Sequence, residues 1–260
     1  MKDIKLLTVA FISLLLFGSI NVNACTGNCL KSKDGGVVYG RTMEWGTFDL
    51  HSRVVMIPRG YRITGSTPDG QNGKVYTGKS GVVGLDMIGT NSPNYDWHMT
   101  NLSNYVNLSQ YSFPAKQISG VEIKRIGAGT CMLGLLGDNT PPSRFILAAA
   151  WNQTARDLPT AKEAVDETFR ILDNFNLPQG PGSSEGTGEG SSDDLMRSST
   201  IWTTAGNLTG LTLNYHTQHH RRVRTLDFKN IEFSKIGQEI VRINLDDEKE
   251  QDIKDITPKL

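Results

Sequence analysis

Cys25, Arg41 and Glu44 bring a thiol, a guanidinium and a carboxyl group into one short stretch, "CTGNCLKSKDGGVVYGRTMEW" (residues 25–45). A thiol becomes a strong nucleophile once it loses its proton, and a neighbouring arginine favours the thiolate. If Cys25 were the first residue of a processed chain, its α-amino group would be a base with an ordinary pKa of about 7.7–8.0. Nucleophile, base and charge partner would then belong to one hairpin, and the chemistry would be acyl transfer, most simply amide hydrolysis.

The segment before Cys25 has the pattern of a secretory signal. Two lysines precede an apolar run from Leu6 to Phe17, and Val22-Asn23-Ala24 places small residues where a signal peptidase cleaves. The run is too short for a permanent span, and no later stretch approaches the roughly 20 apolar residues that such a helix needs. We therefore predict a signal peptide over residues 1–24, an exported product without stable membrane insertion, and Cys25 as its first residue.

Two other roles for Cys25 remain open. A disulfide with Cys29 would be possible in an oxidising compartment, but on a strand the two side chains would lie roughly 13 Å apart, beyond disulfide reach. A lipid anchor would also use a cysteine at this position, although "VNAC" lacks the leucine usual three residues before it. The third cysteine, Cys131, is expected to be a small buried apolar side chain.

Composition narrows the class of partner. Twenty-seven basic residues balance twenty-seven acidic ones, so no overall charge would attract nucleic acid or an anionic membrane. The histidines at 216, 219 and 220 have no partner motif at metal-ligand spacing, so we predict no metal and no cofactor. A small molecule is the expected partner.

The elements that must position these groups follow from turn and periodicity signals. Asp34-Gly35-Gly36 predicts a hairpin between two strands on either side of it, which would bring Arg41 beside Cys25. Helices are expected over Asp96–Val106, around residues 143–155 and from Thr160, where Glu163 completes a capping box. Residues 180–194 predict a flexible loop, paired strands are expected over 199–217 and 222–228, and a charged tail that need not be ordered starts at about 245. Sheets faced by helices give an α+β class in one domain, residues 25–260.

Three blocks resemble the choloylglycine hydrolase family, which contains the bile salt hydrolases and penicillin V acylases. They are residues 25–45, "TNSPNYDWHMTNLSNYVNLS" (90–109) and "GLLGDNTPPSRF" (134–145). The resemblance implies the αββα four-layer sandwich of N-terminal-nucleophile hydrolases, hydrolysis of a linear amide, a periplasmic location like that of the Gram-negative branch, and a homo-oligomer. The acyl group could be that of an acyl amino acid, a penicillin V-type or bile-salt-type conjugate, or an acyl homoserine lactone.

The resemblance also assigns roles to residues. Cys25 matches the nucleophile, Arg41 the arginine beside it, and Glu44 stands where many relatives have an aspartate that contacts the terminal amine. Asn91 matches an asparagine that helps to hold the active site and the oxyanion. A further family arginine has only Arg197 as a candidate match.

One family segment is absent from the sequence. Met87-Ile88-Gly89 joins Asp86 directly to Thr90, where relatives have a long stretch of strands and helices. The sandwich is therefore expected to be incomplete near residues 86–90. The alternative to an amidase is a catalytically inactive, truncated family member with at most a binding role.

Overall fold

The computed structural model describes the hairpin region, most of the centre and the C-terminal strands of the chain. The predicted signal segment, Asn91, Arg197, the predicted loop 180–194 and residues 247–260 of the predicted tail lie outside the described residues. The described ranges are 25–45, 52–56, 60–67, 69, 71–77, 88–89, 93–178, 199–232 and 241–246.

The N-terminal hairpin forms as the sequence predicts. Strands β1 (Gly27–Lys31) and β2 (Val37–Trp45) pair antiparallel, with Gly27 opposite Arg41. At the turn, Gly35 has a φ of 82°, a backbone conformation that favours glycine. The side chain of Asp34 accepts a hydrogen bond from the Gly36 amide and closes the turn. The hairpin thus fixes the register that places residue 41 near the start of β1.

The hairpin lies within a six-stranded antiparallel sheet. The strand order is β11-β10-β9-β2-β1-β6, formed with β6 (Ile88–Gly89), β9 (Ser199–Asn207), β10 (Thr212–Thr217) and β11 (Arg224–Asp227). Strand β6 pairs with Gly27 and Asn28 of β1. Strand β1 therefore has partners on both sides at its first residues.

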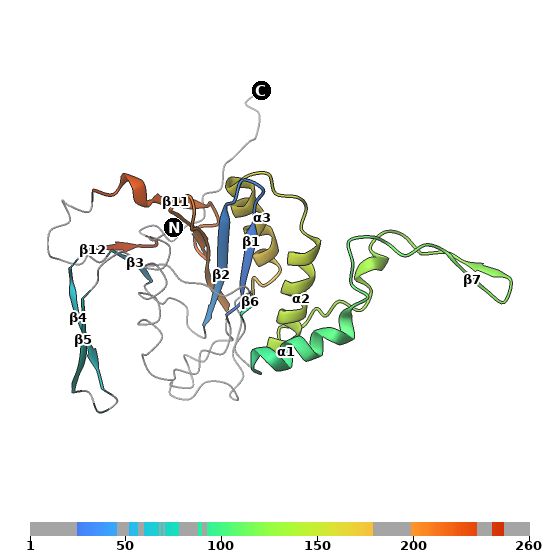
Figure 1. Cartoon of the computed structure of the whole chain (residues 1–260), viewed down its shortest axis with the longest axis horizontal. Helices are drawn as coiled ribbons and strands as arrows, with labels where there is room; N and C mark the ends of the chain where they lie inside the picture. Colours follow the sequence, from blue (N-terminus) through green and yellow to red (C-terminus); the bar gives the residue numbers. More distant parts are fainter. Residues whose placement is uncertain are drawn as a thin grey trace, which may run out of the picture.

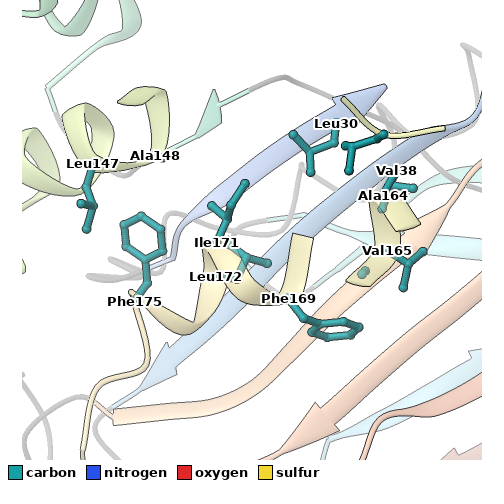
Figure 2. Close-up of a cluster of buried hydrophobic side chains, with 12 residues drawn as sticks. Leu30, Val38, Leu147, Ala148, Ala164, Val165, Phe169, Ile171, Leu172 and Phe175 are labelled. Atoms are coloured by element: carbon teal, nitrogen blue, oxygen red, sulfur yellow. The ribbon is translucent and has the colours of Figure 1, made fainter. Parts of the chain in front are cut away.

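Helices α2 (Pro141–Thr154) and α3 (Ala161–Asp173) cover one face of this sheet (Figure 1). Helix α3 begins at the predicted capping box of Thr160 and Glu163, both halves of which form. Its apolar side chains pack with those of β1, β2 and α2 into the main core, as Figure 2 shows. The approach is close at Gly40, where a Cβ would lie 2.2 Å from Cγ2 of Thr168. The core residues are Leu30, Val38, Leu147, Ala148, Leu158, Ala164, Val165, Phe169, Ile171, Leu172, Phe175 and Ala205.

The opposite face of the sheet carries a two-stranded ribbon of β3 (Arg53–Met56) and β12 (Val241–Asn244). The indole of Trp202 in β9 donates a hydrogen bond to Ser52 Oγ, and the Tyr215 hydroxyl in β10 donates one to the Leu245 carbonyl. At the start of the predicted tail, Asp246 accepts a hydrogen bond from Arg224 Nη1 at 2.6 Å. This salt bridge holds the beginning of the tail against β11.

Helix, sheet and ribbon represent three successive layers of the predicted sandwich. Among the described residues no helix lies on the outer side of the ribbon, and the nearby hairpin of β4 (Arg62–Ser66) and β5 (Asn72–Thr77) pairs only with itself. The α+β class is confirmed by this arrangement of helices on a mostly antiparallel sheet.

An extended arm follows helix α1 (Tyr95–Leu102), which packs on α2 (Figure 1). The helix continues into a 3-10 turn, Ser103–Tyr105, close to the predicted end at Val106. The arm then projects as a hairpin of β7 (Lys116–Ile118) and β8 (Val121–Ile123) before a second 3-10 turn, Thr130–Met132, leads back to α2. A last 3-10 turn, Phe228–Asn230, follows β11. None of the helices in the described ranges is long and apolar enough to cross a membrane.

Candidate active site

The Cys25 thiol and the Arg41 guanidinium meet at the end of the N-terminal hairpin. Arg41 Nη2 lies 3.2 Å from Cys25 Sγ, within hydrogen-bonding distance for sulfur. Burial alone would lower the pKa of Arg41, but the charge interaction and hydrogen bond with Cys25 outweigh burial and raise it. Thr26 and Thr42 tie the two strands together just behind this pair, since the Thr42 amide donates to the Thr26 carbonyl at 2.9 Å. The position of the thiol is therefore set by strand pairing.

Glu44 lies on the helix-facing side of β2 and is 2% exposed. The Thr200 hydroxyl donates a hydrogen bond to Glu44 Oε1 at 3.3 Å, whereas Oε2 has no hydrogen-bond partner among the described residues. Burial raises the pKa of Glu44 to about 7, against the opposing effects of hydrogen bonds from Thr42 and Thr200 and of the charges on two arginines. At neutral pH the carboxyl group can therefore exist in either protonation state.

A β-bulge selects the hydroxyl that contacts Glu44. Met43 pairs with Trp202 but Glu44 pairs with Thr200, so Ile201 is the extra residue on β9. Regular pairing would place Ile201 opposite Glu44. The bulge instead presents the Thr200 hydroxyl, whose oxygen also lies 3.1 Å from the Phe175 carbonyl oxygen, the alternative acceptor for its one proton.

Arg144 completes the charged cluster from the helix side. It belongs to the first turn of α2, is 2% exposed, and donates from Nη1 to the Thr26 hydroxyl at 3.0 Å. Burial lowers the pKa of Arg144, and the negative charge of Glu44 and Cys25 opposes that shift. Nε and Nη2 of this guanidinium have no hydrogen-bond partner in the described part of the chain. A buried arginine with unused donors beside a thiol is suited to hold an oxygen anion or a carboxylate.

Arg144 was not among the predicted site residues, although its position in the sequence indicates a buried charge. The arginine directly precedes an apolar run, Phe145-Ile146-Leu147-Ala148, in the first turn of a helix whose next residues are all buried. A charge next to such a run is rarely buried with it unless it is paired or functional. Arg197, the candidate match for the further family arginine, lies outside the described residues.

A second polar contact links β1 to α2. Asn28 is fully buried and donates from Nδ2 to Asn152 Oδ1 at 3.1 Å. Asn28 and Asn152 lie three and eight residues after Cys25 and Arg144, so the two contacts lie along the same strand–helix interface. Together they fix α2 against β1 at two points.

The structure thus brings three of the four predicted site residues into one cluster. Cys25 and Arg41 are in contact, and the charge of Glu44 acts on Arg41 and on Arg144. Asn91 lies outside the described residues. None of the three cysteines, all of which are described, forms a disulfide. Among the described residues there is no group of three or more His, Cys, Asp or Glu that could hold a metal ion.

Comparison with known proteins places the chain in a family. The model of the linear amide C–N hydrolases, choloylglycine hydrolase family, matches residues 74–242, more than half of the chain. The chain belongs to the choloylglycine hydrolase family. The matched range includes Arg144 but begins after Cys25, Arg41 and Glu44.

Curated members of the choloylglycine hydrolase family match over a shorter range. The conjugated bile acid hydrolase of Lactobacillus gasseri is 36% identical over 107 residues, which are 41% of this chain and 32% of that protein. The bile salt hydrolase/transferase of Clostridium perfringens is 38% identical over 93 residues, 35% of this chain and 28% of that protein. The chain thus matches about a third of the length of these relatives.

Solved structures of the family share the fold. A variant of the conjugated bile acid hydrolase from Clostridium perfringens superposes with a TM-score of 0.67 and 19% identity, covering 89% of this chain and 99% of that chain. Penicillin V acylase from Agrobacterium tumefaciens superposes with a TM-score of 0.57 and 14% identity, covering 85% and 91%. The N-terminal-nucleophile hydrolase fold inferred from the sequence is confirmed.

Proposed function

We propose that the chain is an exported amidase that cleaves a linear C–N amide with Cys25 as an N-terminal nucleophile. The observation that carries the proposal is the 3.2 Å contact between Arg41 Nη2 and Cys25 Sγ in a chain of the linear amide hydrolase family. A guanidinium at this distance favours the thiolate, the reactive form of the side chain.

The reaction would proceed in two halves. The thiolate attacks the amide carbonyl, forming a C–S bond and a tetrahedral oxyanion, and the protonated α-amine of Cys25 gives its proton to the leaving nitrogen as the C–N bond breaks. Water then attacks the resulting thioester, losing a proton to the same α-amine, and the thiolate leaves. The net change is the addition of one water to the amide, which yields a carboxylic acid and an amine.

Glu44 and the two arginines would support these steps electrostatically. The buried Glu44 Oε2 atom, which has no described partner, is a suitable acceptor for the α-ammonium group created by cleavage after Ala24. That positive charge would favour the ionised carboxylate. The unused donors of Arg144 and the side chain of Asn91 are our candidates for holding the oxyanion or a substrate carboxylate.

The substrate class follows the family and stays broad. The named activities of the relatives point to a bile-salt-type or penicillin V-type conjugate as the type of amide. An acyl amino acid and an acyl homoserine lactone are the other candidates that the sequence resemblance offers. Export to a bacterial periplasm rests on the signal-like segment of residues 1–24 alone.

Mass spectrometry of the exported protein tests the nucleophile. After incubation with a chromogenic acyl amide, we expect an N-terminus at Cys25 and an acyl adduct on that residue, with no adduct in a Cys25→Ala variant. The matched control, Cys29→Ala, should retain the adduct, because Cys29 lies two residues beyond Gly27 on β1. A processed N-terminus with neither adduct nor turnover would instead support the inactive, truncated family member.

A homo-oligomer formed through the arm is the second part of the proposal. The arm from Val106 to Leu133 exposes apolar side chains to an unusual degree, including Val106 at 84% and Ile126 at 96%. Soluble proteins seldom leave so many apolar side chains together in water, so such a surface marks an interface. A second copy of the chain is the proposed occupant, because the chain's balanced charge favours self-association over attraction to a charged partner.

A further inference from the structure

A small cavity lies between the sheet and the β12–β3 ribbon. It has a volume of about 140 Å³ and is walled by the starts of β9 and β3, the end of β10 and the end of β12. Ordinary ligand pockets measure about 300–1,000 Å³. A cavity of this size suits the head group of a molecule whose remainder lies elsewhere.

The cavity and Cys25 lie along one row of side chains that crosses the strands. Cys25 lies beside Met43, with 3.8 Å between their sulfurs; Met43 pairs with Trp202, and Trp202 pairs with Thr217, so all four share one row on the ribbon-facing side of the sheet. Trp202 and Thr217 line the cavity. With strands about 4.8 Å apart, these residues lie about 10 and 14 Å from Cys25.

The charges around the cavity favour an anion. The carboxylate of Asp246 is neutralised by Arg224 and also accepts a hydrogen bond from the Thr217 hydroxyl. Arg53, which also lines the cavity, forms no ion pair with any carboxylate among the described residues. The indole of Trp202 is fixed by its hydrogen bond to Ser52, which leaves an ordered apolar wall beside this positive charge.

We propose that this cavity binds a terminal carboxylate of the substrate, about 10–14 Å from the amide carbonyl that reacts at Cys25. The inference rests on the proposed function for the amide that reacts at Cys25, and it adds a carboxylate at the other end of the substrate. The substrate class is thus an elongated amide with a remote carboxylate. Trp202 packs on the chain that leads to this carboxylate, and Arg53 pairs with the carboxylate itself.

Matched substrates test the proposal through turnover. In the first pair, suberic acid mono-p-nitroanilide carries the carboxylate on the acyl half, and octanoyl p-nitroanilide is its neutral counterpart. In the second pair, N-octanoyl-8-aminooctanoic acid carries the carboxylate on the amine half, and N-octyloctanamide is its neutral counterpart. We expect the unsubstituted enzyme to prefer the carboxylate member of one pair by roughly tenfold or more in kcat/KM. The preferred pair identifies the half of the substrate that enters the cavity. Equal kcat/KM values within both pairs would overturn the proposal.

Two arginine variants test whether the preference for the carboxylate substrate depends on Arg53. Arg53→Gln should abolish it by raising KM for the carboxylate substrate, and leave the neutral substrate unchanged. Arg62→Gln is the matched control, since Arg62 is also an exposed strand arginine but does not line the cavity. A preference that survives in Arg53→Gln, or that both variants lose equally, would contradict the assignment.

A binding measurement separates this proposal from the proposed function. Suberate should change the tryptophan fluorescence of the Cys25→Ala protein, and the change should be lost in Cys25→Ala/Trp202→Phe and weakened roughly tenfold in Cys25→Ala/Arg53→Gln. Such binding without any turnover of the native protein would refute the amidase and retain the cavity. Absence of suberate binding at millimolar concentration would overturn the cavity assignment even if turnover is found.

Discussion

Arg41 and Glu44 are three residues apart on β2 but act on opposite faces of the sheet. Arg41 contacts the Cys25 thiol on the ribbon-facing side, and Glu44 is buried on the helix-facing side near Arg144. The two residues therefore have separable effects: Arg41 acts directly on the Cys25 thiol, and the protonation of Glu44 changes the charge beside Arg144.

Arg41→Met should slow alkylation of Cys25 by iodoacetamide at neutral pH by roughly tenfold, because the thiolate loses the cation that favours it. Peptide mass spectrometry measures modification at Cys25 separately from Cys29 and Cys131. Arg62→Met, which removes an exposed arginine from β4, should leave the rate unchanged. An unchanged rate in Arg41→Met would show that the 3.2 Å contact does not activate the thiol.

Glu44→Gln should change how stability depends on pH. The folded pKa of about 7 exceeds the unfolded value of about 4.3, so the folded state holds a proton that the unfolded state releases between these values. The contribution of Glu44 to the free energy of unfolding is complete below pH 4.3 and is lost as the pH rises through 7, by about 4 kcal/mol.

Urea unfolding of the chain with its signal segment attached measures this effect, because no α-ammonium is then present at Cys25. At pH 5 the variant and the unsubstituted chain should be similar, and at pH 8 Glu44→Gln should be the more stable. His216 has the opposite dependence, since burial first and then Arg221 and Arg224 lower its pKa to about 4. Because His216 is common to both proteins, it cancels in the difference. Parallel pH curves would contradict the prediction.

At the scale of elements, α2 is joined to β1 by two buried polar contacts, Arg144 to Thr26 and Asn152 to Asn28. Apolar packing alone would allow a helix to slide along a sheet, whereas a hydrogen bond between fixed atoms sets one position. The Asn28–Asn152 contact therefore keeps Arg144 at the level of Thr26, next to Cys25.

Asn152→Ala should lower the free energy of unfolding by about 1–3 kcal/mol, because it leaves the buried Asn28 amide without its partner. The denaturation midpoint in urea measures the loss. Gln153→Ala is the matched control on the next, exposed position of the same helix and should have little effect. Equal midpoints for the two variants would show that the amide pair does not anchor the helix.

The elements themselves were largely predictable from local signals. The Asp34-Gly35-Gly36 turn and the Thr160–Glu163 capping box act over a few residues, so the hairpin and α3 could be inferred directly. The β-bulge at Ile201 and the entry of Arg144 into the cluster depend on how distant segments pack, which periodicity does not encode. Asp246 was assigned to a tail because its partner, Arg224, is 22 residues away in sequence.

At the scale of the whole molecule, the arm is the part that the core does not stabilise. Its β7–β8 hairpin pairs only with itself among the described strands, and two strands alone are marginally stable in water. A second copy packed on its apolar side chains would provide the burial that the hairpin lacks.

Val121→Lys combined with Ile123→Lys should reduce the molar mass measured by light scattering to that of one chain, because two charges would enter the proposed interface. Both side chains are exposed, at 59% and 50%, so the fold of the isolated chain should be retained. Val75→Lys, on the exposed hairpin of β4 and β5, is the control and should keep the oligomer. A single-chain mass for the unsubstituted protein would refute the arm as an interface.

The bulge at Ile201 bears on how this chain tolerates changes in length. Because Met43 pairs with Trp202 and Glu44 pairs with Thr200, Ile201 is opposite no residue of β2. Deleting Ile201 would remove the extra residue and leave the β2–β9 pairs in place, whereas a deletion far from the bulge would turn the side chains between the two points to the wrong face. The cost of losing Ile201 is its buried side chain and the hydrogen bond that its carbonyl accepts from the Gln218 amide at 2.8 Å, so the bulge is the place where β9 can lose a residue and keep its register with β2.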